Sequence, residues 1–234
     1  NWAHLFDKKD TRDFYELFDE LDRPSLEAYL EEHPEYAKKS LMELDINEAG
    51  LDDKGTTIKT KQGDQVLAIN AQKGVLLVRV KGSDYMGVLA ILKDASKMRC
   101  CAAAHIGSFG ELLEDFVPCC KGIIGVNASG FYDPEGVGNG GTVDGYAICN
   151  GKEYGAHVTH GRKRVEFRTD DKMYIVDAET SVGSGVRDAV EFTPALIIDG
   201  KALIDAQSAF RSIQPRTVIA QSKDGDVMML VVEG

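Results

Sequence analysis

The chain has 234 residues, of which 43% are hydrophobic and 28% are charged, so it is long enough and apolar enough to bury a substantial core. These proportions exclude a disordered tail, a collagen and a coiled-coil rod. The formal net charge is -11, from 27 lysines and arginines against 38 aspartates and glutamates, which excludes a broad basic footprint for DNA or RNA. We therefore expect no nucleic-acid partner.

Most of the negative charge lies at the N-terminus. Residues 1–54 hold sixteen acidic and seven basic side chains, a net of -9, which leaves -2 for residues 55–234. Apolar residues recur at helical spacing from Phe14 to Leu21, and Pro24 begins a second helical run. We predict an acidic helical appendage or stalk over residues 1–54, followed by one domain over residues 55–234.

From Gly55 onward the pattern changes to short strands and turns. A capping-box spacing from Ser108 to Glu111 predicts one short helix, which Pro118 ends. Many short strands with a few packed helices indicate an α+β fold with a mixed or antiparallel sheet. The predicted strands cover residues 56–60, 66–70, 74–82, 88–92, 122–126, 146–149, 172–177, 195–198, 217–220 and 227–232.

The densest polar signal is the loop of residues 127–142, which follows the predicted strand 122–126. It contains five glycines together with asparagine, aspartate and threonine side chains. Exposed backbone amides and polar side chains suit the binding of a sugar or a phosphate. A long hairpin built from ordinary turn residues has the same composition, so both interpretations stay open.

Two further residues are candidates for a site. Arg216 stands at the start of a predicted strand, where its guanidinium can bind a carboxylate or phosphate, although a surface ion pair is the alternative. His105 precedes the predicted helix, and we place it near a site. The basic stretch of residues 162–164, close to His157 and His160, is typical of an exposed turn.

The cysteines do not follow a zinc-binding pattern. They occur as two adjacent pairs and a single Cys149, which we predict to be a small buried residue of a strand. An odd number allows at most two intrachain disulfides, and the sequence leaves their formation open. No cluster of histidine, aspartate or glutamate has ligand spacing either, so we predict no metal site and no cofactor.

The order of these segments resembles the bacterial branch of the phosphodiester glycosidase family, the NAGPA-like domain, over residues of about 75–234. The matching segments in family order are Val80-Lys81-Gly82 with Tyr85-Met86-Gly87, residues 124–131, Asp133-Pro134 with residues 138–142, residues 194–201, and residues 215–221 with Lys223-Asp224-Gly225.

The resemblance implies a hydrolase that cleaves the bond between the anomeric carbon of a sugar and a phosphodiester, with glycan or sugar-phosphate material as the substrate. It implies three catalytic residues: Arg216 neutralises the phosphate, Asn127 hydrogen-bonds to the sugar or phosphate, and Asp133 supplies a carboxylate. A phosphodiester leaving group needs cationic and amide stabilisation more than a strong general acid. The substrate-binding residues that the resemblance implies are His105, Gly130, Asn139, Gly141, Thr142 and Thr217.

In the family, the strand matching residues 227–233 precedes a helix and an Asp-Gly-Gly-Ser segment that contributes to the active site. The chain as given stops at Gly234, so we expect a C-terminally incomplete domain and a full-length parent that carries the activity. The chain starts at Asn1 without a methionine, and we expect a removed upstream signal or membrane anchor and an extracellular or cell-surface location. The alternative is a non-catalytic carbohydrate-binding or envelope-assembly module on the same fold.

Overall fold

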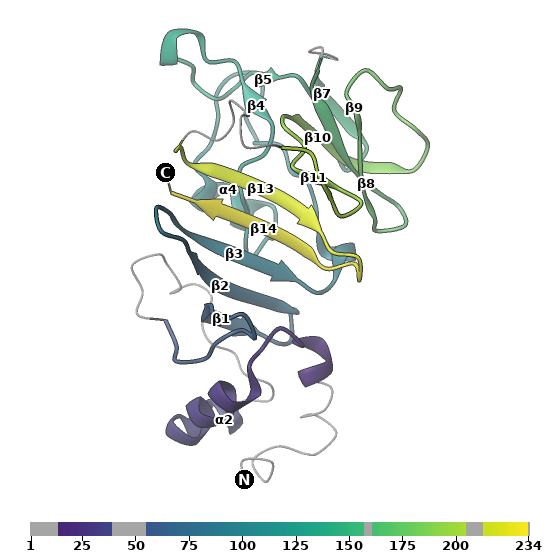
Figure 1. Cartoon of the computed structure of the whole chain (residues 1–234). Coiled ribbons are helices and arrows are strands. Elements are labelled where there is room, and N and C mark those ends of the chain that lie inside the picture. Colours follow the sequence, from purple (N-terminus) through teal and green to yellow (C-terminus); the bar gives the residue numbers. More distant parts are fainter. Residues whose placement is uncertain (1–13, 39–54, 157–160, 205–212, 234) are drawn as a thin grey trace. The chain divides into compact units, whose positions relative to one another are not determined.

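The chain forms two compact units, each built around a five-stranded antiparallel sheet (Figure 1). Unit 1 comprises residues 1–95 and 214–234, and unit 2 comprises residues 96–213. The expected α+β class is confirmed, because antiparallel strands dominate and the helices are short. The computed structural model describes residues 14–38, 55–156, 161–204 and 213–233.

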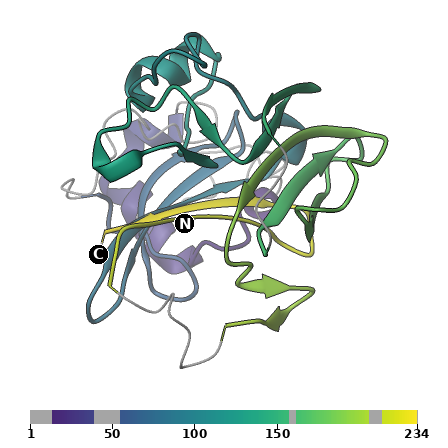
Figure 2. The same cartoon turned by 90° about the horizontal axis from the view of Figure 1, so that it is seen from above.

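The sheet of unit 1 has the strand order β1-β2-β3-β14-β13, so the C-terminal hairpin completes a sheet that the first three strands begin (Figures 1 and 2). Each of the apolar runs predicted for these strands forms one, and Leu76 and Val227 are fully buried. The strands are β1 (Gln65–Asn70), β2 (Val75–Lys81), β3 (Met86–Leu92), β13 (Arg216–Gln221) and β14 (Val227–Val232).

The strand predicted over residues 56–60 is wrong. Only Lys59 and Thr60 make isolated bridges there. The hydroxyl of Thr56 donates to the carbonyl of Val66 at 2.7 Å and accepts from the backbone N–H of Ile58 at 3.0 Å. These local side-chain bonds compete with a regular ladder and turn the chain.

The described part of the N-terminal segment is helical, as predicted. Residues 14–17 are helical and are followed by α2 (Arg23–Glu32) and α3 (Pro34–Lys38). The carboxylate of Asp22 caps α2 by accepting from the N–H of Ser25 at 3.0 Å, which satisfies one of the free donors at the helix start.

Backbone hydrogen bonds connect this segment to the residues that precede β1. The N–H of Lys61 donates to the carbonyl of Glu20 at 2.8 Å, and the N–H of Asp22 donates to the carbonyl of Lys59 at 2.9 Å. Phe18 is fully buried. The domain boundary at residue 54 stays a prediction, for which these contacts provide a test.

The sheet of unit 2 has the order β7-β6-β10-β8-β9. Its strands are β6 (Tyr146–Cys149), β7 (Lys152–Gly155), β8 (Lys163–Arg168), β9 (Met173–Asp177) and β10 (Val186–Phe192). The sequence pattern predicted β6 and β9 but did not predict β7, β8 or β10. The basic stretch predicted as an exposed turn is wrong for Arg164, which is fully buried in β8, while His157 and His160 lie outside the described residues.

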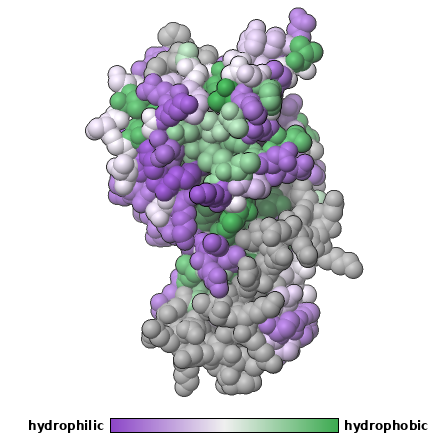
Figure 3. Space-filling view, turned by 180° about the vertical axis from the view of Figure 1, so that it is seen from behind, coloured by the Kyte–Doolittle hydropathy of each residue, from purple (hydrophilic) through white to green (hydrophobic). Residues whose placement is uncertain are grey.

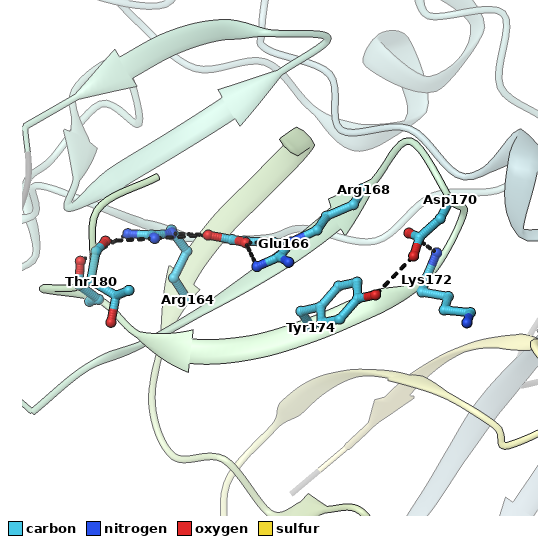
Figure 4. Close-up of polar contacts among 8 residues, drawn as sticks. Arg164, Glu166, Arg168, Asp170, Lys172, Tyr174 and Thr180 are labelled. Atoms are coloured by element: carbon cyan, nitrogen blue, oxygen red, sulfur yellow. Dashed lines mark hydrogen bonds and ion pairs between the residues drawn. The ribbon is translucent and has the colours of Figure 1, made fainter. Parts of the chain in front are cut away.

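Arg164 is buried with its guanidinium held by four hydrogen bonds (Figure 4). Its Nε and Nη2 donate to Oε1 of Glu166 at 2.9 and 2.8 Å, and its Nη1 and Nη2 donate to the carbonyls of Ala178 and Thr180 at 2.9 and 2.8 Å. Arg168 donates to the other carboxylate oxygen of Glu166 at 3.0 and 2.7 Å. Alternate residues of a strand share a face, so β8 places these three charges side by side.

The capping box predicted at residues 108–111 is also wrong. Helix α4 (Leu113–Cys119) starts later, with Leu112 at its N-cap and no side-chain cap, and Pro118 lies inside its last turn. The carboxylate of Glu111 instead accepts from the N–H of Ala104 at 3.2 Å.

Residues 122–126, predicted as a buried strand, are not a strand. Lys121 has a positive φ of 57°, and its N–H donates to the carbonyl of Pro118 at 2.9 Å. The N–H of Gly122 donates to the carbonyl of Val117 at 2.9 Å. This is the Schellman arrangement that ends a helix, so these residues terminate α4 and do not enter a sheet.

The remaining elements are short. The strand predicted over residues 195–198 covers only two residues, and it pairs with one that was not predicted. None of the helices that the structure describes has the length and apolar character needed to span a bilayer. The elements are η3 (Ala95–Lys97), β4 (Gly130–Phe131), η4 (Pro134–Gly136), β5 (Val143–Asp144), β11 (Ile197–Ile198) and β12 (Lys201–Ala202).

Candidate functional site

The polar loop of residues 127–142 belongs to a hairpin of unit 2. Strands β4 and β5 pair antiparallel, with Gly130 opposite Asp144 and Phe131 opposite Val143. The N–H of Tyr132 continues the pairing by donating to the carbonyl of Thr142 at 2.8 Å. The residues between them form a long tip, so the hairpin interpretation is correct for the base of the loop.

A carboxylate organises the tip of the hairpin. Oδ1 of Asp133 accepts a hydrogen bond from the N–H of Gly138 at 2.6 Å. A Cβ on Gly138 would lie 2.6 Å from the carbonyl oxygen of Tyr132 and 2.8 Å from the Cα of Asp133. Only glycine allows this close approach, and Asp133 therefore has a structural role in the loop.

Asn139 joins the tip to the segment that carries His105. Its Nδ2 donates to the carbonyl of Ser108 at 2.7 Å, and its Oδ1 accepts from the N–H of Gly141 at 3.0 Å. Its own carbonyl accepts from the N–H of Gly110 at 2.8 Å. One amide side chain thus holds two segments that lie about thirty residues apart in the sequence.

Glycine 141 permits this docking. It is buried, its carbonyl accepts from the N–H of Gly107 at 2.6 Å, and a Cβ at this position would lie only 2.4 Å from the backbone nitrogen of Phe109. The rings of His105 and Phe109 stack with centroids 4.5 Å apart. We call the two segments together the docked loop (residues 105–110 and 127–142); His105 and Asn139 are exposed on it and Gly141 is buried.

Residues 121–234 match the family model described as phosphodiester glycosidase. Over these residues the chain is similar to the phosphodiester glycosidase family. The match confirms the resemblance over these residues, and it includes the hairpin, its tip and strand β13. A search of the curated proteins found no match.

The family match supports a hydrolase-type function for residues 121–234, with a glycan phosphodiester as the class of substrate. Seven of the expected site residues lie in the docked loop, all in unit 2. They are His105, Asn127, Gly130, Asp133, Asn139, Gly141 and Thr142. Asn127 is exposed three residues before β4.

Arg216 and Thr217 lie in unit 1, at the start of the edge strand β13. Arg216 pairs with Val232 across the hairpin, and its Nη1 donates to the carbonyl of Pro215 at 3.2 Å. Its side chain is exposed. These two residues belong to a different unit from the docked loop, so their assignment to the site rests on the family resemblance.

Sequence analysis missed the residue that supports the base of the hairpin. Nη2 of Arg162 donates to Oδ2 of Asp144 at 2.7 Å, and Nη1 donates to the carbonyl of the same residue at 3.0 Å. Beside it, Glu191 is fully buried and its Oε2 accepts from the N–H of Tyr146 at 3.1 Å. Arg162 belongs to the basic stretch of residues 162–164, which the sequence pattern assigned to an exposed turn.

Large apolar side chains are exposed close to the polar tip. Phe131 and Tyr132 keep 49% and 64% of their surface accessible, and Phe109 keeps 48%. On the face seen from behind, Figure 3 shows a pale-green patch of apolar side chains flanked by hydrophilic ones. Aromatic side chains beside a few fixed polar groups are typical of a small-molecule binding surface.

Within the described residues, no group of three or more histidine, cysteine, aspartate or glutamate side chains is arranged to hold a metal ion. The docked loop offers backbone amides, amide side chains, the imidazole of His105 and the carboxylates of Asp133 and Glu135. Such groups bind hydroxyls and anionic oxygens by hydrogen bonding.

Proposed function

We propose that the phosphodiester glycosidase domain hydrolyses the bond between the anomeric carbon of a sugar and a phosphodiester. The observation that carries this proposal is that the family match includes the hairpin whose tip Asn139 fixes against residues 105–110. A fixed polar loop provides donors that need no reorganisation when negative charge develops on the leaving phosphate.

Arg216 neutralises the phosphate in this proposal, and Asn127 hydrogen-bonds to the sugar or the phosphate. A guanidinium offers two parallel N–H donors that match two phosphate oxygens, which an ammonium does not. Thr217 contributes to substrate binding beside Arg216. The exposed ring of Tyr132 provides an apolar face for the sugar.

The test of Arg216 is the release of free sugar from a panel of sugar phosphodiesters by the protein. Charge-assisted hydrogen bonds contribute roughly 1.5–3 kcal/mol each, so Arg216→Ala is expected to lower turnover about ten- to several-hundredfold. Arg216→Lys should recover part of that loss. Lys223→Ala is the matched control, because it removes one exposed positive charge from the same hairpin. Equal rates in all four proteins would remove Arg216 from the site.

A second test separates two roles of the Asp133 carboxylate: it accepts the hydrogen bond from Gly138, and it is proposed to take part in catalysis. In Asp133→Asn the amide oxygen can still accept from Gly138, so the loop should keep its shape while the charge is lost. A large loss of turnover in Asp133→Asn therefore supports a catalytic carboxylate. Unchanged turnover would leave only the hydrogen bond to Gly138 as the role of this residue.

The docked loop can be tested through its glycines. Gly141→Ala places a methyl group against the backbone of Phe109 and should detach the two segments, with loss of turnover. Gly183→Ala is the control, because it has open space around the added Cβ. If Gly141→Ala retained full turnover, the loop would not be part of the site.

We also propose an extracellular or cell-surface location, because the resemblance implies that the protein acts on glycan or cell-wall material. Fractionation of the producing cells tests this. A protein that binds the sugar phosphodiesters but releases no sugar would favour the non-catalytic carbohydrate-binding or envelope-assembly module.

A further inference from the structure

Four of the five cysteines form two close pairs within unit 2. Sγ of Cys100 lies 3.0 Å from Sγ of Cys149. Cys101 is close enough to Cys120 for an interaction between the two thiols to contribute to the raised pKa of Cys120. The fifth, Cys119, is exposed, and the structure has all five as free thiols.

The backbone explains why the adjacent residues Cys100 and Cys101 have different partners. They lie in a stretch without helix or turn, residues 98–103. Consecutive side chains of an extended chain point to opposite sides. Cys100 therefore reaches the end of β6, while Cys101 reaches the residue that follows α4.

Both pairs join segments that lead into the docked loop. The stretch with Cys100 and Cys101 continues directly to His105. Cys120 is the C-cap residue of α4, a few residues before Asn127. Cys149 ends β6, which follows the hairpin base. A bond at each pair would fix the backbone on both sides of the loop.

We propose that unit 2 contains two disulfide-forming sites, one between Cys100 and Cys149 and one between Cys101 and Cys120, which close in the presence of a small-molecule disulfide such as oxidised glutathione. In each reaction one S–S bond forms between the two cysteines and the S–S bond of the oxidant breaks. The two thiol protons and two electrons leave with the oxidant, which is released as two thiols.

The electrostatics of the first pair favour one order of reaction. The hydrogen bond from Cys100 lowers the pKa of Cys149, and the same contact, together with burial, raises the pKa of Cys100. The thiolate is the nucleophile in disulfide exchange. Cys149 therefore attacks the oxidant first, and Cys100 then displaces the released thiol from the mixed disulfide.

The test is a disulfide map of the full chain after incubation with oxidised glutathione and alkylation of the remaining thiols. Cleavage after arginine, lysine and glutamate separates the cysteines into peptides 100–111, 115–121 and 136–152. We expect peptide 100–111 to be linked to both others, and the number of alkylated thiols to fall from five to one, at Cys119.

Three single variants assign the links. Cys149→Ser should keep only the link between peptides 100–111 and 115–121, and Cys120→Ser only the link between peptides 100–111 and 136–152. Cys119→Ser is the matched control and should keep both. Five alkylated thiols in the wild type, a bond between Cys119 and Cys120, or bonds between separate chains would each overturn the proposal.

The consequence for unit 2 is measurable without an activity assay. The bond between Cys100 and Cys149 closes a loop of 49 residues, and disulfides over such loops raise Tm by roughly 5–15 °C in a chain of this size. The oxidised wild type should show this shift relative to the reduced protein. The double variant Cys120→Ser with Cys149→Ser should show none. Equal Tm values for oxidised and reduced wild type would show that the bond between Cys100 and Cys149 does not stabilise unit 2.

Discussion

The two five-stranded sheets bury different kinds of side chain. In unit 1 the sheet interior consists of aliphatic residues such as Ile69, Leu76 and Val227. In unit 2 the strands of the sheet also bury charged side chains, and Glu166 in β8 and Glu191 in β10 are almost completely inaccessible. Apolar burial depends only on area and shape, whereas each buried charge depends on a particular partner. The two sheets should therefore respond differently to mutation.

The buried charges of unit 2 fix turns as well as strands. Oδ1 of Asp188 in β10 accepts from the N–H of Asn150 at 2.8 Å, at the turn between β6 and β7. Its Oδ2 accepts from Nε of Arg187 at 2.8 Å, and Nη1 of Arg187 donates to Asp171 at 2.8 Å, at the turn between β8 and β9. One ion pair thus holds two turns, which an aliphatic pair does not do.

The largest effect is expected from removing residues 1–54. The charge count predicts a separable appendage, but Phe18, Leu21 and Leu26 are fully buried. Burying such side chains contributes about 1.5–3 kcal/mol each, so the shortened chain should lose roughly 5 kcal/mol or more of stability. Urea denaturation monitored by circular dichroism measures this. An unchanged midpoint would show that the appendage is separable after all.

The next effect concerns the buried charges of unit 2. Glu166→Ala leaves the guanidinium of Arg164 buried without its counter-charge, and we expect a loss of about 3–5 kcal/mol in the free energy of unfolding. Asp177→Ala, which removes an exposed ion pair with Lys163 from the same sheet, should cost less than about 1 kcal/mol.

A double variant separates the cost of an unpaired charge from the value of the ion pair. Arg164→Met combined with Glu166→Leu removes both charges and should destabilise the protein less than Glu166→Ala alone. If the double variant were the less stable of the two, the ion pair itself would contribute net stability, and the contrast between the sheets would need another explanation.

The third effect tests the apolar sheet. Leu76→Ala in β2 creates a cavity in a fully buried position, and we expect a loss of about 2–5 kcal/mol. Val231→Ala on the exposed side of β14 is the control, with an expected loss below about 1 kcal/mol. Similar losses for the two variants would mean that the interior of unit 1 relaxes around the cavity.

The same contrast explains how much of the fold could be predicted. The strands of unit 1 are apolar runs between turn residues, and that pattern is local. In β8 the alternation of Arg164, Val165, Glu166 and Phe167 has the period of a strand, but charges usually indicate an exposed face. The groups that permit their burial, including the carbonyl of Thr180, come from after the next strand. A sequence pattern does not show such distant partners.

The candidate site divides in the same way. The composition of residues 127–142 and their match to the family were sufficient to identify the loop. The contact of Asn139 with the backbone of Ser108 was not predictable, because it joins segments whose local sequences carry no sign of each other. The misplaced helix start followed from this contact, since the segment that resembled a capping box is bound to the hairpin tip.

The smallest effect is expected at Lys93, a largely buried lysine of unit 1 that pairs with several acidic side chains. Nζ of Lys93 donates to Glu20 at 2.7 Å and to Asp226 at 2.6 Å, so it joins the N-terminal segment to the start of β14. Lys93→Met removes charge-assisted bonds and should cost roughly 1–3 kcal/mol at neutral pH. Lys73→Met, at an exposed lysine, is the control.

The pH dependence of this loss follows from the protonation of Lys93. Burial acts against the ammonium, but the hydrogen bonds with Asp226 and Glu20 outweigh it, so the pKa of Lys93 is raised above its ordinary value. The folded state therefore holds this proton more tightly than the unfolded state, and the stabilisation is complete below the pKa of the unfolded chain. It is lost as pH rises through the higher folded pKa. The stability difference between wild type and Lys93→Met, measured by urea denaturation, should thus be constant at neutral pH and shrink above about pH 10.4. The difference between wild type and Lys73→Met should stay near zero throughout, and a Lys93 difference that grew with pH would contradict the assignment.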